Sequence, residues 1–165
     1  MPVIAVTHPL IRHKIGLLRE DQISTKKFRE LTHELARLLA YEATADFPLE
    51  KTTIDCWSGP VEIDQIAGRK VTVVPILRAG LGMLEGMVRL LPSAEVGFLG
   101  MQRDEETLQA ITYANRLPDD LSGRQVYVLD PMLATGGSMA DAIHYLRDRG
   151  ADDITAVCLL SAPEG

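Results

Sequence analysis

Cysteine is scarce in this chain of 165 residues, which contains only Cys56 and Cys158. Small secreted domains that depend on disulfides are much richer in cysteine, so we expect two reduced, buried thiols, with Cys158 in the middle of a strand. Long apolar runs are also missing, since no stretch approaches the roughly 18 residues of a membrane-spanning helix. Residues 1–10 contain two prolines and a histidine and do not resemble a secretory leader. These absences predict a cytoplasmic protein that does not associate with membranes.

Aromatic residues and positive charge are in short supply as well. Aromatic side chains make up 5% of the chain, and Trp57 and Tyr113 are expected to pack within the fold. The 17 Lys and Arg residues face 23 Asp and Glu residues, which gives a formal net charge of −6. Because general nucleic-acid affinity comes from many cations that neutralise phosphates, this balance argues against a nucleic-acid partner. It still permits a small anionic ligand, which needs only one local group of donors.

Two common kinds of catalytic site are not indicated. The four histidines (His8, His13, His33 and His144) lack the spacing of a zinc site. The chain also has no G-x-S-x-G motif and no Cys/His pattern of a nucleophilic enzyme. The composition is otherwise ordinary, with 46% hydrophobic and 24% charged residues. At about 150 residues per domain, the length predicts a single domain over residues 1–165.

The apolar residues predict an α/β fold. Residues 1–23 mix apolar and basic side chains and indicate an N-terminal arm with short helical pieces. A long helix is expected from Ser24 or Thr25, because either hydroxyl can accept a hydrogen bond from the first turn, and its apolar stripe fades near residues 46–48. Four continuously apolar runs of strand length follow, namely Val71–Leu77, Glu95–Met101, Val126–Asp130 and Ile154–Leu160.

Helical patterns over Leu81–Leu91 and Ser138–Arg149 separate these strands. This alternation is typical of a mainly parallel sheet flanked by helices. Right-handed crossovers then place the loops that follow the first and third strands at the carboxyl edge of the sheet, where such folds bind ligands.

The loop after the third strand carries the clearest chemistry. The strand delivers the carboxylate of Asp130, and Thr135-Gly136-Gly137-Ser138 follow immediately before a helix. Two glycines let the backbone approach a ligand closely, and the start of a helix supplies unpaired N–H groups with partial positive charge. Together these features predict a phosphate cradle. The spacing and lysine of a P-loop are absent, as is the G-x-G-x-x-G dinucleotide turn.

A carboxylate beside a bound phosphate needs a partner other than that phosphate. An ionised Asp130 accepts hydrogen bonds, and a ribose diol offers two donors. The segment is therefore interpreted as a grip for a ribose 5-phosphate. The alternative is an ordinary glycine-rich turn between a strand and a helix.

Five stretches of the chain resemble the type I phosphoribosyltransferases, and specifically the uracil phosphoribosyltransferases. These stretches are His8-Pro9-Leu10, Pro75-Ile76-Leu77-Arg78-Ala79-Gly80-Leu81-Gly82, Arg103-Asp104-Glu105-Glu106-Thr107, Asp130-Pro131-Met132-Leu133-Ala134-Thr135-Gly136-Gly137-Ser138 and Ala162-Pro163-Glu164-Gly165. The fourth is the most specific, because most phosphoribosyltransferases have a second acidic residue where this chain has Pro131.

The resemblance implies a role for each matching residue. Asp130 would hold the ribose hydroxyls of 5-phosphoribosyl 1-diphosphate (PRPP), and Pro131, Met132, Leu133, Ala134, Thr135, Gly136, Gly137 and Ser138 would complete the binding of its sugar phosphate. Arg78, Ala79 and Gly80 would form a diphosphate loop, with a cis peptide expected near Arg78–Ala79. Arg103 would reach the diphosphate from a flexible hood over residues 101–117. Asp130, Arg103 and Arg78 are thus the expected catalytic residues.

The implied reaction transfers phosphoribose from PRPP to uracil and yields UMP and diphosphate, a step of pyrimidine salvage. Mg²⁺ is the expected cofactor, bound through substrate oxygens rather than protein side chains, because Pro131 replaces a carboxylate. The uracil-binding residues are expected beyond Gly165, in a segment that this sequence does not contain. The resemblance further implies a homo-oligomer, a dimer or larger, and in some members activation by GTP.

Two other interpretations remain open at this level. One is a regulator with the same fold that binds RNA and senses nucleotides, although the negative charge speaks against it. The other is a phosphoribosyltransferase for a different base.

Overall fold

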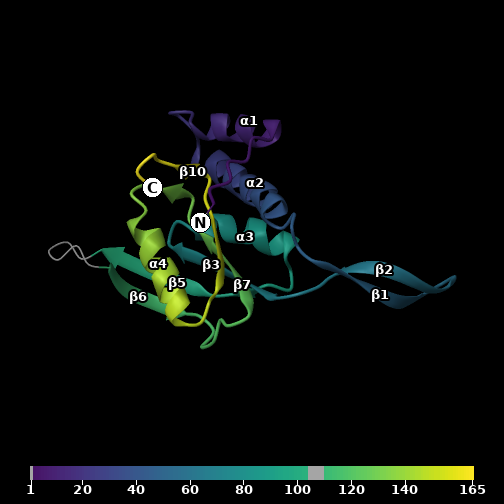
Figure 1. Ribbon diagram of the computed structural model, residues 1–165. Coiled ribbons are helices and arrows are strands. Elements are labelled where there is room, and N and C mark those ends of the chain that lie inside the picture. Colours follow the sequence, from purple (N-terminus) through teal and green to yellow (C-terminus); the bar gives the residue numbers. More distant parts are fainter. Residues whose placement is uncertain (1, 104–109) are drawn as a thin grey trace.

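A computed structural model of the chain describes residues 2–103 and 110–165 (Figure 1). Of residues 102, 103, 110 and 111 it describes only the backbone. The helices are α1 (Pro9–Leu18), α2 (Thr25–Ala43), α3 (Leu81–Leu90) and α4 (Gly137–Asp148). The first strands are β1 (Leu49–Cys56), β2 (Gly59–Ile66), β3 (Lys70–Leu77), β4 (Glu95–Val96) and β5 (Phe98–Arg103). The later strands are β6 (Ala110–Arg116), β7 (Arg124–Leu129), β8 (Met132–Leu133), β9 (Asp153–Val157) and β10 (Leu160–Ser161).

The central sheet confirms the predicted α/β architecture. Its strands lie in the order β6-β5-β3-β7-β9, and β4 also pairs with β3. All of these pairs are parallel except β5 with β6, which form an antiparallel hairpin. The predicted strand over Glu95–Met101 is divided into β4 and β5 at Gly97, whose N–H donates to the Val73 carbonyl at 3.0 Å.

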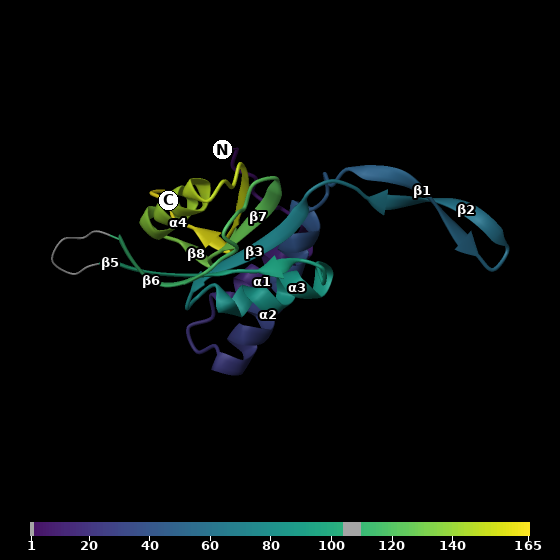
Figure 2. The same ribbon diagram turned by 90° about the horizontal axis from the view of Figure 1, so that it is seen from below.

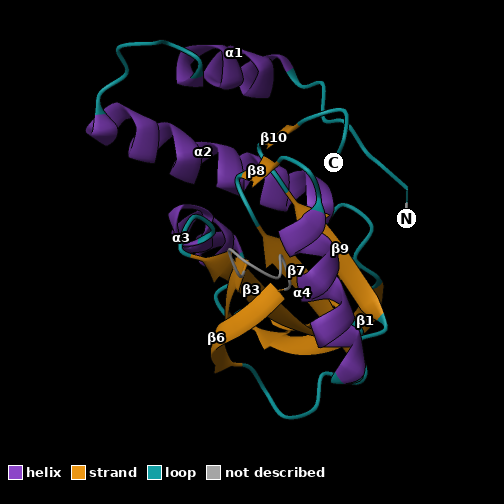
Figure 3. Cartoon of the chain, turned by 90° about the vertical axis from the view of Figure 1, so that its left-hand side faces the viewer, coloured by secondary structure: helices purple, strands orange, loops and turns teal. Residues whose placement is uncertain are grey.

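Two apolar cores cover the two faces of this sheet. Val74, Val126 and Val128 face a cluster that includes Met139 and Leu146 of α4. The alternate strand residues Val73, Tyr127 and Leu129 face a second cluster with Ala36 and Ala40 of α2 and Met83 and Met87 of α3. Helix α4 therefore lies on one face, and α2 and α3 lie on the other (Figures 2 and 3). This double coverage explains why the strands are continuously apolar in the sequence.

The helix boundaries agree closely with the sequence pattern. The Ser24 hydroxyl accepts a hydrogen bond from the Lys27 N–H at 3.2 Å, so Ser24 is the N-cap of α2. In the N-terminal arm, the Nδ1 atom of His8 accepts from the Leu10 N–H at 3.1 Å and caps α1. Lys14 then joins α1 to Glu34 of α2 through an ion pair of 2.5 Å. No helix among the described residues combines the length and apolarity needed to cross a membrane.

A long hairpin formed by β1 and β2 is the main element that the sequence pattern did not predict. It extends away from the body of the protein (Figures 1 and 2). Trp57 lies in its turn and is 97% exposed, so the expectation that this residue packs within the fold is wrong. Cys56 ends β1 and is half-buried rather than buried. An exposed ribbon buries neither face deeply, so its sequence lacks a strong apolar pattern.

The close packing of α2 against α3 gives the first prediction. A Cβ added to Gly86 would lie 2.6 Å from the His33 carbonyl oxygen and 2.7 Å from the Ala36 Cβ. Gly86→Ala should therefore cost about 1–3 kcal/mol of unfolding free energy, because two helices must separate. Urea denaturation measures this cost.

Gly16→Ala in α1 is the matched control, because the added Cβ would meet no atom within 4 Å apart from its chain neighbours and the nearby backbone of its own helix. It should stabilise the protein by about 0.5–1 kcal/mol, through the higher helix propensity of alanine. Equal effects of the two variants would contradict the packing argument.

Candidate functional site

Two loops meet at the carboxyl edge of the sheet because β3 and β7 are parallel neighbours. Their register pairs Val74 with Val128 and Pro75 with Leu129, near the ends of both strands. The loop Arg78–Gly80 follows β3 directly, and residues 130–138 follow β7. The structure therefore brings together the two groups of residues that the sequence singled out.

The strand, the tight loop and the helix start that make up the predicted cradle are present at residues 124–138, and its binding of phosphate remains a prediction. Gly136 is the N-cap of α4 and has a φ of 79°, a left-handed conformation that favours glycine. No side chain in the described chain caps this helix, so the N–H groups of its first turn are available to a ligand. A hollow of about 70 Å³ lies here, lined by Asp130, Met132, Leu133, Ala134, Thr135, Gly136, Gly137, Ser138 and Met139.

Asp130 lines this hollow and is half-buried. Its N–H donates to the Val157 carbonyl at 3.3 Å, which extends the pairing of β7 with β9 by one residue. One carboxylate oxygen accepts a hydrogen bond from the Met132 N–H at 3.3 Å. Burial raises the pKa of Asp130, and the Met132 hydrogen bond partly opposes that rise. The carboxylate therefore retains capacity to accept hydrogen bonds from a ligand.

The Arg78–Gly80 loop is held tightly against the sheet. A cis peptide joins Leu77 to Arg78, one bond before the predicted position. Gly80 is buried, and a Cβ there would meet the Leu129 carbonyl oxygen and lie 2.8 Å from the Ile76 nitrogen. Arg78 and Ala79 are exposed at the same edge. The glycine lets this loop lie beside the end of β7, where the cradle begins.

The segment after β9 supports the cradle, a role that the sequence analysis did not assign. Parallel pairing joins β10 to β8, and the Ala162 N–H donates to the Leu133 carbonyl at 2.8 Å. Gly165 contacts the loop so closely that a Cβ on it would lie 2.8 Å from the Ala134 carbonyl oxygen. The Ala-Pro-Glu-Gly motif was the one feature of the sequence that drew attention to this segment, and it indicated only a family resemblance.

Cys158 lies between β9 and β10 rather than in the middle of a strand. It is half-buried and free, and burial together with the negative charge of Asp130 raises the pKa of its thiol to about 11. The thiol is therefore protonated at neutral pH. It is not suited to act as a nucleophile.

The predicted hood is described only in part. Residues 101–103 belong to β5 and residues 110–116 to β6, which form the antiparallel hairpin of the sheet. Residues 104–109 and the side chain of Arg103 lie outside the described part of the chain. The expected contact of Arg103 with a diphosphate remains a prediction.

The donor set at the cradle does not fit a protein-held magnesium ion. Asp130 is the one carboxylate among the residues that line the hollow. Among the described residues, no group of three or more His, Cys, Asp or Glu side chains is placed to hold a metal ion. Mg²⁺ prefers several oxygen ligands and is often bound through substrate phosphates.

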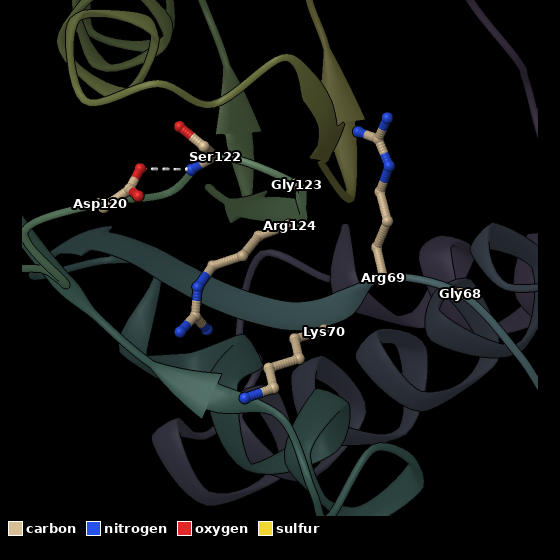
Figure 4. A pocket seen from close by; sticks show the side chains of 7 residues that line it. All are labelled: Gly68, Arg69, Lys70, Asp120, Ser122, Gly123 and Arg124. Carbon is tan, nitrogen blue, oxygen red and sulfur yellow. Dashed lines mark hydrogen bonds between the residues drawn. The ribbon is translucent and has the colours of Figure 1, made fainter.

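A larger hollow of about 620 Å³ lies at the opposite edge of the sheet, where β3 and β7 begin (Figure 4). It is lined by Gly68, Arg69, Lys70, Asp120, Ser122, Gly123 and Arg124. Arg124 is paired with Glu95 at 2.6 Å and Arg69 with Asp152 at 2.7 Å. Because both guanidinium groups already have carboxylate partners, we assign the candidate site to the smaller cradle.

The raised pKa of Asp130 gives a prediction for stability. A carboxyl group whose pKa is higher in the folded state than in the unfolded state destabilises the fold when it is ionised. As the pH falls, this destabilisation begins to decrease near the folded-state pKa and is gone below the unfolded-state pKa. Asp130→Asn should therefore be more stable than wild type near pH 7, and the difference should shrink toward about pH 4. Urea denaturation across this range measures it.

Asp120→Asn provides a control of opposite sign. Hydrogen bonds from Ser122 lower the pKa of Asp120, so its ionised form favours the folded state. Its replacement should lower stability at neutral pH. An Asp130→Asn protein that is less stable than wild type at neutral pH would contradict the burial argument.

Comparisons with known proteins agree with this geometry. The family model described as uracil phosphoribosyltransferase matches residues 5–165. A solved protein of Aquifex aeolicus is 41% identical, with a TM-score of 0.89, and the match covers 99% of this chain and 78% of that chain. A hypoxanthine-guanine phosphoribosyltransferase of Bacillus anthracis is 14% identical, with a TM-score of 0.60 and coverage of 82% and 69%.

A hypoxanthine phosphoribosyltransferase of Staphylococcus aureus is 13% identical, with a TM-score of 0.62 and coverage of 96% of this chain and 74% of that chain. At such low identity, the two purine enzymes establish a shared fold and nothing about the base. The family match spans nearly the whole chain and includes both loops of the site. The chain therefore belongs to the uracil phosphoribosyltransferase family.

Proposed function

We propose that this phosphoribosyltransferase uses uracil as its acceptor base and converts uracil and PRPP to UMP and diphosphate. The observation that carries the proposal is the juxtaposition of Asp130 with the start of α4. One carboxylate and a turn of free backbone N–H groups are complementary to a ribose with a terminal phosphate. The uracil assignment depends on the family match over residues 5–165. A cytoplasmic location is part of the same proposal.

Each group of residues in the site would bind a different part of the substrate. The N–H groups of residues 136–139 and the hydroxyls of Thr135 and Ser138 would bind the 5-phosphate. The Asp130 carboxylate would accept hydrogen bonds from the ribose hydroxyls. The Arg78 guanidinium lies at the same edge and can bind two oxygens of the diphosphate at once.

The chemistry would then be electrostatic rather than covalent. When the bond between C1 of the ribose and the diphosphate breaks, positive charge develops on the sugar ring and negative charge on the leaving group. Arg78 would stabilise the leaving diphosphate, and the family resemblance implies the same role for Arg103. Magnesium would accompany the diphosphate as part of the substrate.

Calorimetric titration of the full chain with PRPP tests the proposal, followed by a transfer assay with uracil. Asp130→Asn should weaken PRPP binding by about 10–100-fold, because it removes a hydrogen-bond acceptor that carries full charge. Asp148→Asn is the control, since it removes a carboxylate at the far end of α4. Adenine, hypoxanthine and orotate are added to the transfer assay as competing bases.

Three results would contradict the proposal in different ways. Absence of PRPP binding by the wild-type chain would remove the phosphoribosyl assignment itself. Transfer to another base in preference to uracil would overturn only the choice of base. Binding of RNA together with nucleotide binding and no transfer would favour a regulator.

We also propose that two copies of the chain assemble through the β1–β2 hairpin. Pairing of Ile54 with Val61 and of Thr52 with Ile63 puts three large apolar side chains on one face of this ribbon. Ile54 and Val61 are 41% and 42% exposed. A two-stranded hairpin that extends from the body is only marginally stable by itself, so a covering surface would stabilise it.

Charge complementarity indicates where a second copy would receive the hairpin. Residues 49–66 contain four carboxylates and one lysine, whereas residues 2–19 contain Arg12, Lys14 and Arg19 and no acidic residue. The N-terminal segment also exposes apolar side chains, with Val3 at 95% and Ile4 at 82%. We propose that the hairpin of each copy contacts the N-terminal segment of the other, as a twofold dimer allows.

Sedimentation velocity over a series of concentrations tests this assembly. Ile54→Lys should make the protein monomeric, because it places a charge on the apolar face. Thr53→Lys, the matched control, alters the adjacent residue on the opposite face and should leave the dimer intact. A wild-type chain that remains monomeric, or equal behaviour of the two variants, would rule out this interface.

A further inference from the structure

Tyr113 occupies an irregular position in the β5–β6 hairpin. Gly100 pairs with Ala114 and Met101 with Thr112, so Tyr113 is one extra residue in β6. Such a bulge redirects a side chain and is frequent next to active sites. The bulge lies on the strand pair adjacent to β3, the strand that leads into the Arg78–Gly80 loop.

The redirected ring lies directly on the backbone of the neighbouring strand. A Cβ built on Gly100 would lie 2.7 Å from Cε2 and 2.8 Å from Cζ of Tyr113. Any residue other than glycine at position 100 would displace the ring. The pairing of Gly100 with Leu77 of β3 places this contact beside the last residue before Arg78.

The hydroxyl group of Tyr113 completes a bridge from β6 across β5 to β3. It donates to the Leu77 carbonyl oxygen at 3.5 Å. At the other end of the loop, the Gly80 N–H donates to the Ile76 carbonyl at 2.8 Å. The Arg78–Gly80 loop is therefore held at both ends. Burial of the ring does not by itself explain this position of Tyr113, because the residue is 52% exposed.

We propose that Tyr113 is a positioning residue, which ties the root of the β5–β6 hairpin to the Leu77 carbonyl and thereby fixes the Arg78–Gly80 loop for binding a diphosphate. The inference rests on the proposed function, because the diphosphate is the ligand of that loop. Tyr113 would act through the loop and has no direct role in the reaction.

A comparison of the binding of two ligands distinguishes this positioning role from a general effect on the fold. PRPP carries the diphosphate, whereas ribose 5-phosphate uses only the cradle and Asp130. Tyr113→Phe should weaken PRPP binding by about 2–10-fold, the value of one neutral hydrogen bond, and leave ribose 5-phosphate binding unchanged. Tyr41→Phe removes a hydroxyl from an exposed position on α2 and should change neither affinity.

Hydrogen exchange of the ligand-free protein provides a second measurement. The amides of Gly80 and Leu81 should exchange faster in Tyr113→Phe than in Tyr41→Phe, since one attachment of the loop is lost. Unchanged exchange, or equal weakening of both ligands, would overturn the positioning role. If Tyr113→Phe binds PRPP as wild type does, the inference fails while the proposed function stands. If the wild-type chain binds neither ligand, the proposed function fails, and with it the diphosphate role of the loop.

Discussion

The parallel pairing of β3 with β7 is the constraint on which the rest of the structure depends. Both strands are buried on both faces, so their register is set by hydrogen bonds along the ladder and by two apolar cores at once. This register ends the two strands at one edge of the sheet. A loop with an arginine and a loop with a carboxylate and a helix start are then neighbours, although about fifty residues separate them in the chain.

At that edge the site is built mainly from backbone, and glycines make this possible. Gly136 takes a left-handed turn at the start of α4, and Gly80 and Gly165 lie where a Cβ would meet a carbonyl oxygen. Backbone N–H groups are a good match for an anion because they carry no charge of their own that must be paired in its absence. The exception is Asp130, whose charge is unfavourable where it is half-buried. Retention of such a group is the usual compromise between stability and ligand binding.

The protein places different tasks on different parts of the fold. The carboxyl edge of the sheet brings Arg78 and Asp130 together with the start of α4, and the β1–β2 hairpin extends from the body with an acidic, partly apolar surface. The β5–β6 hairpin reaches the site through Tyr113, whose ring lies on Gly100. The site and the Tyr113 contact join residues that are distant in the sequence, whereas β1 and β2 are consecutive strands. The larger hollow at the amino edge has its arginines already paired, which shows that size alone does not identify a site.

The sequence by itself determined the central strands, the helices that cover them and the cradle after Asp130. These elements depend on local patterns: continuous apolar runs, a serine at the start of α2, and glycines before α4. The β1–β2 hairpin was not predicted because its apolar residues are few and partly exposed, so they form no continuous run like those of the central strands. Trp57 and Cys56 were misjudged for the same reason. Only the tertiary structure decided that residues 160–165 support the cradle and that Tyr113 reaches the Leu77 carbonyl. Those contacts join separate strands, and their geometry is fixed by packing and register rather than by any local property of the chain.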